Sequence, residues 1–359
     1  MPDESASDPR NDTASPQVAI LGLGQMGLCC AAMLAGPDPK VPGGARPRVR
    51  LWGHEEGEVG RLSQTRRSDR LPGFELPGSA RVALSDGEAL EGADIVVAAV
   101  PSQVMRETFA RLGRFIPRDA GIVSVAKGIE NETLMRPSQV IADMLGDDPD
   151  ARPRPIAALS GPSIATELAR GMPATMVAAS DDPAFAERVQ LLFSTSYLRV
   201  YTNDDLLGVE LAGAVKNVIA IAAGVLDGLN AGFNAKSALL ARGLAEITRL
   251  GTAMGGSTHT FFGVAGMGDL VTTCFSPEGR NRACGEALGR GENLDDYLER
   301  SRFVVEGVAT TKSVIDLAER YRVEMPITRA VHDVVFEGLD PVRAIAKLMS
   351  RELRDEREG

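Results

Sequence analysis

Short apolar runs alternate with helical patterns through the first half of the chain. The apolar runs are Gln17–Leu21, Arg48–Gly53, Asp94–Val100, Gly121–Ala126 and Pro155–Leu159. Apolar strands separated by helices are typical of a parallel sheet that helices cover on both faces. Ligands of such sheets bind outside the carboxyl ends of the strands. The residues that follow the strands should therefore share one edge, and they are Gly22–Gly27, His54, Pro101, Lys127 and Gly161–Ser163.

After Tyr197–Tyr201 the apolar period changes from that of strands to that of helices. Long helices are predicted over Asp205–Leu226 and Lys236–Met254, followed by shorter ones to Leu348. We therefore expect an N-terminal Rossmann-like, doubly wound and mostly parallel sheet with a C-terminal all-helical domain. The expected division is a disordered leader at 1–16, a dinucleotide-binding domain at 17–203, a helical substrate and catalytic domain at 204–350, and a charged tail at 351–359.

One cation interrupts the most apolar segment, Gly208–Gly224. The neighbours of Lys216 three and four positions away are Ala212, Gly213, Ile219 and Ala220, so its helical face is apolar. Burial would lower the pKa of this lysine from its ordinary value of about 10.4. An amine that exchanges a proton near neutral pH can act as a general acid or base. The alternative is a helix end from which the lysine reaches water.

A glycine-rich turn follows the first apolar run and opens a helical pattern. Gly22, Gly24 and Gly27 stand in the order of strand, turn and helix that the dinucleotide fingerprint requires. The first glycine makes the turn, the second lets a pyrophosphate approach the backbone, and the third lets the helix pack on the strand. The helix N-terminus would face the phosphates. The alternative is a turn that uses glycine only for its backbone freedom.

The end of the second strand bears on the choice of coenzyme. An acid that binds the free 2′-hydroxyl of NAD often stands there, whereas this chain has His54, followed by Glu55 and Glu56. A histidine could tolerate or pair with the 2′-phosphate of NADP. The cofactor is therefore expected to be NADP or NAD, with NADPH slightly favoured. The alternative for His54 is a solvated residue at the strand end.

Four other residues carry candidate chemistry, each with a structural alternative. Lys127 could meet an anionic substrate or lower the pKa of a nearby lysine, or it could be a solvated surface residue. Ser163 could bind a ligand or cap the next helix. Asp269, which follows a glycine-rich loop, could orient Lys216 or form an Asx turn. Arg280 begins a helix and suits a phosphate, because guanidinium binds phosphate in a bidentate manner, but it could also be a surface residue.

Composition narrows the class of protein. The chain has 359 residues, enough for two domains, and is 44% hydrophobic and 25% charged. Its 39 basic and 49 acidic residues give a net charge of −10, which argues against nonspecific binding to nucleic acid or anionic membranes. Neither the cysteines nor the histidines have metal-ligand spacing, and no uninterrupted apolar run could span a bilayer. We expect a reduced cytoplasmic enzyme with no metal.

With these residues in view, the chain resembles the bacterial NAD(P)-dependent glycerol-3-phosphate dehydrogenase family from about Val18 to Leu348. The motifs that carry the resemblance are GLGQMG at 22–27 with its flanks, VPS at 100–102, AKG at 126–128, SGPS at 160–163, GAVKNVIAIAAG from Gly213, NAKSALLARGLAEITRLG from Asn234, GMGDLVTTC from Gly266, RNR from Arg280, VVEG from Val304 and VEMPI from Val323. The resemblance implies reduction of dihydroxyacetone phosphate to sn-glycerol 3-phosphate by hydride transfer from NAD(P)H, for glycerophospholipid synthesis.

The resemblance also assigns roles to residues. Lys216 falls on the family's proton-transfer lysine. The implied substrate-binding residues are Lys127, Gly161, Ser163, Asn217, Asp269, Thr273, Gly279, Arg280 and Asn281. The implied cofactor-binding residues are Gly22, Gly24, Gln25, Met26, Gly27, His54, Lys127, Ala165, Arg280, Val304 and Glu306. We expect a homodimer that takes a small-molecule substrate and does not stably bind membranes.

The chain departs from the family pattern at several positions. Gln25 and Met26 stand where Ser-Tyr or Ser-Trp is common, so their contacts are less secure than the backbone cradle. Gly279 replaces a common serine and removes one hydroxyl from the expected phosphate pocket, whereas Ser163 replaces a threonine and keeps the hydroxyl. The segment 36–47 is longer than usual.

Two other functions compete with this interpretation. A 3-hydroxyacid or 6-phosphogluconate type of dehydrogenase shares the expected fold and a lysine on a buried helix, but does not account for the adjacent Arg280 and Asn281. A nonenzymatic redox sensor would bind the dinucleotide without turning over a substrate.

Overall fold

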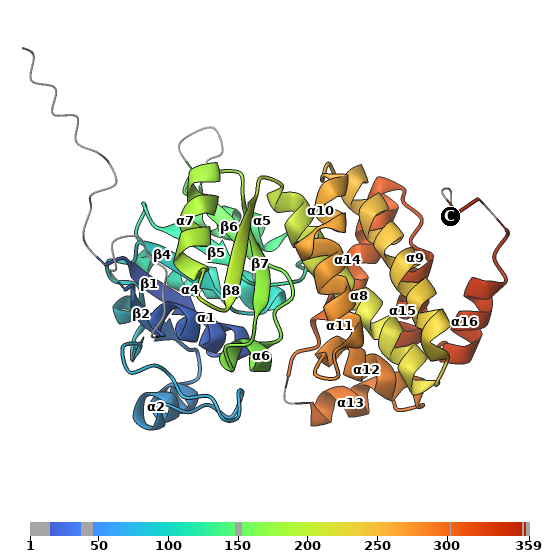
Figure 1. Cartoon of the computed structure of the whole chain (residues 1–359), viewed down its shortest axis with the longest axis horizontal. Helices are drawn as coiled ribbons and strands as arrows, with labels where there is room; N and C mark the ends of the chain where they lie inside the picture. Colours follow the sequence, from blue (N-terminus) through green and yellow to red (C-terminus); the bar gives the residue numbers. More distant parts are fainter. Residues whose placement is uncertain (1–14, 37–45, 148–152, 302, 354, 357–359) are drawn as a thin grey trace, which may run out of the picture.

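The computed structural model describes residues 15–36, 46–147, 153–301, 303–353 and 355–356. The strands gather in the N-terminal part of the chain, and helices form the C-terminal part beside them (Figure 1). The expected leader and the 36–47 insertion lie largely outside the described residues, and the charged tail lies partly outside them.

The described residues form one eight-stranded sheet in the order β3-β2-β1-β4-β5-β6-β7-β8. The strands are β1 Gln17–Leu21, β2 Arg48–Trp52, β3 Arg81–Val82, β4 Ile95–Ala98, β5 Gly121–Ser124, β6 Ile156–Ser160, β7 Ala174–Ser180 and β8 Leu198–Asn203. Their pairing is parallel except between β6 and β7. The strand order reverses between β1 and β4, which is the topological switch point of a doubly wound sheet. The mostly parallel Rossmann-like sheet is confirmed.

The sequence pattern did not predict β3 or β7. β3 has only two residues, too few to show any period. β7 is rich in alanine and runs antiparallel to β6, with Ala157 opposite Ser180. An antiparallel partner needs no long helical crossover, and the helix between β6 and β7 is only five residues long. A rule that expects a full helix after each strand therefore does not predict β7.

Alternate residues of each strand pack on opposite faces of the sheet. On one face, Val18 and Ile20 join a core with α1 and α7, whereas on the other Ala19 and Leu21 pack with Phe109 and its neighbours. The helices of this part are α1 Gln25–Ala35, α2 Glu56–Thr65, α3 Asp86–Leu90, α4 Met105–Leu112, α5 Pro137–Leu145, α6 Ala165–Ala169 and α7 Pro183–Phe193, with short 3₁₀ turns at Ser102–Val104 and Gly113–Phe115.

The C-terminal part is helical, as predicted. Its helices are α8 Leu206–Gly228, α9 Gly232–Ala253, α10 Thr258–Phe262, α11 Asp269–Phe275, α12 Arg280–Gly289, α13 Leu294–Arg300, α14 Glu306–Tyr321, α15 Pro326–Phe336 and α16 Pro341–Met349. The expectation of a glycine-rich loop before Asp269 is wrong, because Val264–Gly268 forms a π-helical turn. A Cβ on Gly266 would lie 2.1 Å from the carbonyl oxygen of Phe261, so glycine permits this tight winding.

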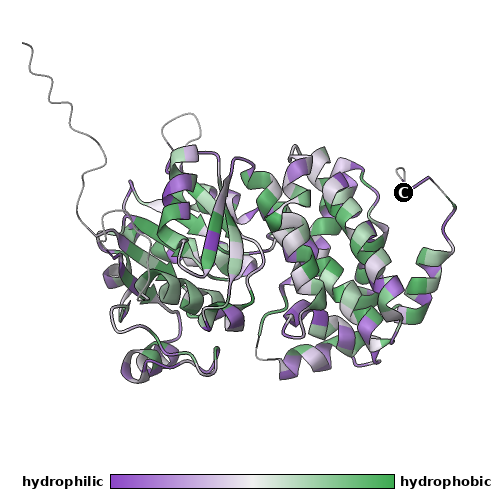
Figure 2. Cartoon of the chain, viewed as in Figure 1, coloured by the Kyte–Doolittle hydropathy of each residue, from purple (hydrophilic) through white to green (hydrophobic). Residues whose placement is uncertain are grey.

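Helix α8 forms the centre of the helical part. Among the described residues it is the helix that is long and apolar enough to cross a membrane by length and composition, but 89% of its most apolar window is buried inside the protein. The apolar colouring of Figure 2 accordingly continues through the interior of the helical part, where α9, α11, α12 and α14 surround α8. Asp205 caps the start of α8 by accepting a hydrogen bond from the amide of Gly208.

Helices α8 and α12 cross at backbone contact. A Cβ on Gly224 would lie 1.9 Å from the carbonyl oxygen of Arg282, and one on Gly285 would lie 1.9 Å from that of Ile221. Gly228 and Gly289, four positions further along each helix, meet the opposite backbone in the same way, so small residues at this spacing let the two backbones touch. The close crossing brings the N-terminus of α12 against the middle of α8.

We expect Gly285→Ala to lower the free energy of unfolding by about 1–3 kcal/mol, because the added methyl group would force the two helices apart. Urea denaturation measures this change. The control is Gly60→Ala on α2, where the described structure places no atom within 4 Å of the new Cβ. That variant should gain roughly 0.5–1 kcal/mol from helix propensity. Equal effects of the two substitutions would contradict the crossing.

Candidate active site

Lys216 lies in the middle of α8 and is 5% exposed. Its Nζ donates hydrogen bonds to Asp269 Oδ1 at 2.9 Å and to Thr273 Oγ1. Burial lowers the pKa of Lys216 from 10.5 to about 8, the carboxylate of Asp269 partly offsets this, and the ammonium group of Lys127 lowers the pKa further. The alternative of a lysine that reaches water from a helix end is excluded. The structure thus holds an amine that can change its charge near neutral pH.

Asp269 joins two lysines through one buried carboxylate. Its Oδ2 accepts a hydrogen bond from Lys127 Nζ at 2.7 Å, while Oδ1 accepts from Lys216. Burial alone would raise the pKa of Asp269, but the two ammonium groups outweigh it and hold that pKa below its ordinary value. Asp269 therefore stays ionised between two cations. These ion pairs, and not an Asx turn, account for its position.

The amine of Lys127 is also held on its other side. It donates to the carbonyl oxygen of Gly161 at 2.9 Å and to Ser163 Oγ at 3.1 Å. Ser163 in turn donates to the Gly161 carbonyl, and Gly161 has a φ of +128°, which glycine adopts without strain. Ser163 does not cap the following helix, whose N-cap is Ile164 without a side-chain hydrogen bond. Lys127 is thus a partly buried member of the site and not a solvated surface lysine.

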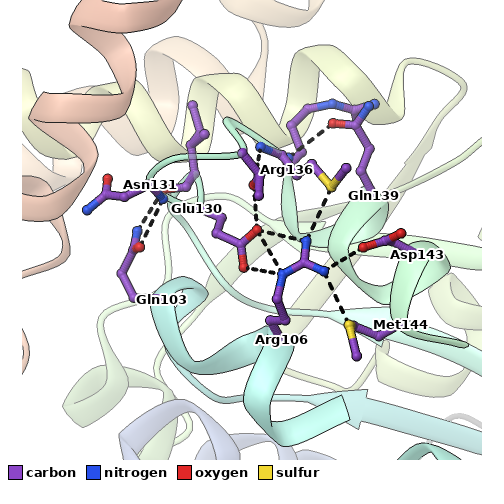
Figure 3. A network of polar contacts seen from close by, with 11 residues as sticks. Gln103, Arg106, Glu130, Asn131, Arg136, Gln139, Asp143 and Met144 are labelled. Atoms are coloured by element: carbon purple, nitrogen blue, oxygen red, sulfur yellow. Dashed lines mark hydrogen bonds and ion pairs between the residues drawn. The ribbon is translucent and has the colours of Figure 1, made fainter. Parts of the chain in front are cut away.

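Two ion pairs fix the segment that follows Lys127. Figure 3 shows the first, in which Glu130 pairs with Arg106 of α4 at 2.9 Å. Six residues further on, Arg136 pairs at 2.5 Å with Glu210, whose side chain is 1% exposed. Glu210 lies on α8, the helix that also carries the buried lysine. The segment after β5 is therefore attached to α8, which fixes the position of Lys127 relative to Lys216.

A chain of amides crosses the site from the sheet to α14. Asn217 Nδ2 donates to the carbonyl oxygen of Lys127 at 2.8 Å, and Asn281 Nδ2 donates to Asn217 Oδ1 at 2.9 Å. Asn281 Oδ1 then accepts from the amide of Gly307 at 2.9 Å. The two asparagines thus connect the end of β5, α8, α12 and α14.

These side chains surround a small cavity of about 170 Å³. Its lining includes the expected substrate-binding residues Lys127, Ser163, Asn217, Asp269, Thr273, Gly279, Arg280 and Asn281, together with Lys216. Gly161 contributes through its carbonyl contact to Lys127. The structure therefore brings together residues that lie up to 154 positions apart in the chain (281 − 127).

A larger cavity of about 420 Å³ adjoins it, because Gln25, Met26, Arg280, Val304 and Glu306 line both. The larger cavity lies over the glycine turn and the carboxyl ends of β1, β2 and β4, and its lining includes Gly22, Gly24 and His54. The shared edge expected from the strand ends is thus present.

The glycine turn fits a dinucleotide. A Cβ on Gly22 would lie 2.7 Å from the carbonyl oxygen of Ala99, and one on Gly27 would lie 2.1 Å from that of Gly22. At Gly24, by contrast, no described atom lies within 4 Å of the Cβ position, which leaves the backbone at the start of α1 open to a ligand. Tight packing at the first and third glycines and open space at the second match the fingerprint.

The other expected cofactor contacts lie around these cavities. The side chain of His54 is 66% exposed at the end of β2. Ala165, the first residue of α6, lines the small cavity, and its carbonyl accepts a hydrogen bond from the Cys29 thiol. Burial raises the pKa of Glu306, and the neighbouring Arg280 partly offsets this. Arg280 itself donates to the Val304 carbonyl at 3.3 Å.

Part of the larger cavity is formed by residues that the sequence pattern did not indicate. Its lining also includes Trp52, Glu58, Arg70 and Arg111. Trp52 could have been found, because it lies directly before Gly53 at the end of the second predicted strand. The other three come from helices or a connection after a helix, and no local pattern shows that they turn toward the strand ends.

Comparisons with known proteins agree along the chain. Residues 17–186 match the family described as NAD-dependent glycerol-3-phosphate dehydrogenase N-terminus, and residues 205–346 match its C-terminus. A glycerol-3-phosphate dehydrogenase (NAD(P)+) of Chlorobium limicola is 46% identical over 340 residues, 94% of this chain and 99% of that protein. One of Bacillus pumilus is 42% identical, over 93% of this chain and 94% of that protein. The crystal structure of the glycerol-3-phosphate dehydrogenase of Coxiella burnetii matches with a TM-score of 0.86 at 36% identity, covering 94% of this chain and 99% of that chain.

The charges around Lys216 predict opposite effects of two substitutions. Asp269→Asn removes the charge that raises the pKa of Lys216, so this pKa should fall below about 8. Lys127→Met removes a charge that lowers it, so the pKa should rise. NMR of ¹³C-labelled lysine measures both titrations, and the chain has only six lysines to assign. Shifts in the same direction, or no shift, would contradict the arrangement.

Proposed function

We propose a mechanism for this chain, which belongs to the family of NAD-dependent glycerol-3-phosphate dehydrogenases: Lys216 exchanges the proton that accompanies hydride transfer. The chain is a glycerol-3-phosphate dehydrogenase (NAD(P)+), as family matches along most of its length show. The proposed reaction is the reduction of dihydroxyacetone phosphate to sn-glycerol 3-phosphate. The observation that carries the mechanism is a buried amine with a lowered pKa where a small polar cavity meets a dinucleotide cavity.

The reaction adds a hydride and a proton across the ketone. When bound, the nicotinamide supplies the hydride to the carbonyl carbon. The Lys216 ammonium donates a proton to the carbonyl oxygen as negative charge develops there, and the neutral amine removes it in the reverse direction. Because the pKa of Lys216 is about 8, both protonation states are populated near neutral pH.

Asp269 and Lys127 prepare this amine. Asp269 holds Lys216 by a 2.9 Å hydrogen bond and prevents the desolvated ammonium from losing its proton too readily. Lys127 opposes this effect through its own positive charge and adds a cation at the cavity wall. The result is a net positive cluster that attracts an anionic substrate and its developing oxyanion.

The phosphate group of the substrate is assigned to the start of α12. Arg280 is the first residue of this helix, and its 3.3 Å contact to a carbonyl leaves guanidinium donors for a bidentate pair with phosphate. Backbone amides at a helix N-terminus favour anions as well. Asn281 and Gly279 line the same cavity. A phosphate held here would orient the ketone for hydride attack.

The competing functions have less support. Neither a 3-hydroxyacid dehydrogenase nor a redox sensor accounts for the family matches, or for a cavity that combines a Lys–Asp–Lys cluster with Arg280 and Asn281. We further propose that the chain works in the cytoplasm and uses both NADPH and NADH, with NADPH slightly favoured. The division into domains at 17–203 and 204–350 likewise stays a proposal, supported by the end of β8 at Asn203 and the start of α8 at Leu206.

Replacement of Lys216 tests the mechanism. We expect Lys216→Met to lower kcat for dihydroxyacetone phosphate reduction by roughly 10²–10⁴-fold, since the proton donor is lost, with little change in coenzyme binding. Stopped-flow assays of NAD(P)H oxidation and coenzyme titrations measure both quantities. In the wild type, reduction should slow as the pH rises through about 8, because Lys216 loses the proton it donates, while oxidation should accelerate.

The control for this variant is Lys347→Met, which removes an exposed lysine that pairs with Asp333 and should leave kcat unchanged. Lys347 lies on α16, at the end of the helical part away from the sheet (Figure 1). Activity of Lys216→Met within about tenfold of the wild type, a loss of only about 1.4 kcal/mol of transition-state stabilisation, would contradict the mechanism.

We propose that the enzyme is a homodimer. The side chains of Met267, Val271 and Phe275 follow one another at four-residue spacing along the π-helical turn and α11, and they are 47%, 37% and 45% exposed. Apolar side chains gathered in this way are typical of surfaces that a partner covers. Sedimentation at micromolar concentration should give twice the 38.0 kDa mass of one chain, and a mass of one chain would contradict the proposal.

A further inference from the structure

We propose that Glu58 and Arg70 form a coenzyme selector. Arg70 binds the 2′-phosphate of NADPH. Glu58 repels this phosphate and accepts a hydrogen bond from the 2′-hydroxyl of NADH. The inference rests on the proposed function in one respect, that the coenzyme occupies the larger cavity. It names the residues that decide which coenzyme is preferred there.

The two side chains form a bidentate ion pair on the cavity wall. Arg70 Nε donates to Glu58 Oε1 at 2.6 Å, and Arg70 Nη2 donates to Glu58 Oε2 at 3.1 Å. The side chain of Glu58 is 13% exposed and that of Arg70 is 36% exposed. Both line the larger cavity together with His54. Glu58 belongs to the first turn of α2, and Arg70 lies in the connection after that helix.

The pair is tied to the phosphate cradle. Gln25, the residue after the second glycine of the turn, donates from Nε2 to the carbonyl oxygen of Arg70 at 2.9 Å. Gly24 and Gln25 line the same cavity as the ion pair. The position of Arg70 is therefore fixed relative to the backbone that would hold the pyrophosphate. A ribose next to that pyrophosphate would share the cavity with the ion pair.

The end of β2 explains why a selector is needed. In folds of this kind an acid at the strand end accepts the ribose hydroxyls of NAD, and an arginine nearby accommodates the phosphate of NADP. Here the strand ends with Trp52, and Gly53 and His54 follow, so no acid stands at that position. Glu58 from the next helix supplies the carboxylate, and Arg70 supplies the guanidinium. This chain therefore carries both recognition groups and neutralises one with the other.

Each coenzyme would use a different half of the pair. A carboxylate keeps lone pairs free even when it binds arginine, so Glu58 can accept a 2′-hydroxyl without breaking the pair. The guanidinium has five donor hydrogens, of which Glu58 engages two, so Arg70 can also reach a 2′-phosphate. The phosphate dianion would then lie close to the negative charge of Glu58, which weakens its binding. Glu58 thus limits the preference for NADPH that Arg70 creates.

Two substitutions test the selector through opposite effects. Glu58→Gln should raise the affinity ratio of NADPH over NADH by about tenfold, because the repelling charge is lost while the side-chain length is kept. Arg70→Met should lower the same ratio by about tenfold, because the phosphate loses its cation. The dissociation constants are measured by fluorescence titration with each coenzyme, and kcat/KM for dihydroxyacetone phosphate is measured in parallel with both.

The matched controls are Glu75→Gln and Arg67→Met. These residues form an exposed pair, 4.0 Å between Arg67 Nη2 and Glu75 Oε2, in the same connection but not on the cavity wall. They should leave the ratio within about twofold of the wild type. If Glu58→Gln and Arg70→Met also leave the affinity ratio within about twofold of the wild type, or if they weaken the binding of both coenzymes equally, the ion pair only stabilises the fold. The selector proposal is then wrong.

A further variant separates failure of the selector from failure of the coenzyme site. Gly24→Val would place a side chain in the open space beside the glycine turn, where no described atom lies within 4 Å of the Cβ position. It should weaken both coenzymes by at least about tenfold without moving their ratio. If Gly24→Val binds both coenzymes normally, the coenzyme lies elsewhere, which overturns the selector together with the proposed location. If Gly24→Val weakens both coenzymes but Glu58→Gln and Arg70→Met do not change the affinity ratio, the selector proposal is wrong and the location of the coenzyme is correct.

Discussion

The site depends on one buried carboxylate shared by two ammonium groups. A desolvated lysine is costly, typically by several kcal/mol for each buried ion, unless an opposite charge and hydrogen bonds compensate for its lost hydration. Asp269 supplies this compensation to Lys216 and Lys127 at the same time, with one oxygen for each. Because burial lowers the pKa of Lys216 more than Asp269 restores it, and Lys127 lowers it further, Lys216 holds its proton only weakly. The fold therefore produces a labile proton and an anion-attracting cavity from the same three side chains.

This arrangement constrains several distant elements at once. Lys216 lies on α8, Lys127 follows β5, and Asp269 begins α11 directly after a π-helical turn. A register shift in any of the three would leave a charge buried without its partner, which is much more costly than loss of a surface ion pair. The bracing of the Lys127 segment by Arg106 and of α8 by Arg136 serves this requirement. So does the backbone contact between α8 and α12, which sets Asn281 beside Asn217.

Local patterns predicted most of the elements, for reasons visible at particular residues. The runs that became β1, β4, β5 and β6 are buried almost throughout, and those that became β2 and β8 bury alternate residues, so their period and length were informative. The failures lie where local rules do not apply. β3 is too short to have a period, β7 pairs antiparallel without a crossover helix, and the glycines before Asp269 wind into a π-helical turn and do not form a loop.

The sequence by itself determined the class of fold, the glycine turn and the apolar surroundings of Lys216, because each depends on residues that are neighbours along the chain. It offered Asp269 and Lys127 as possible partners of that lysine, but it left Lys127, Ser163, Asp269 and Arg280 each with a structural alternative. The tertiary structure decided that Asp269 joins two lysines and that Ser163 contacts Lys127 instead of capping a helix. It also showed that Glu58 and Arg70 face the dinucleotide cavity. Periodicity specifies which face of an element is buried, but the partner that this face meets depends on how distant elements pack, and no local pattern contains that information.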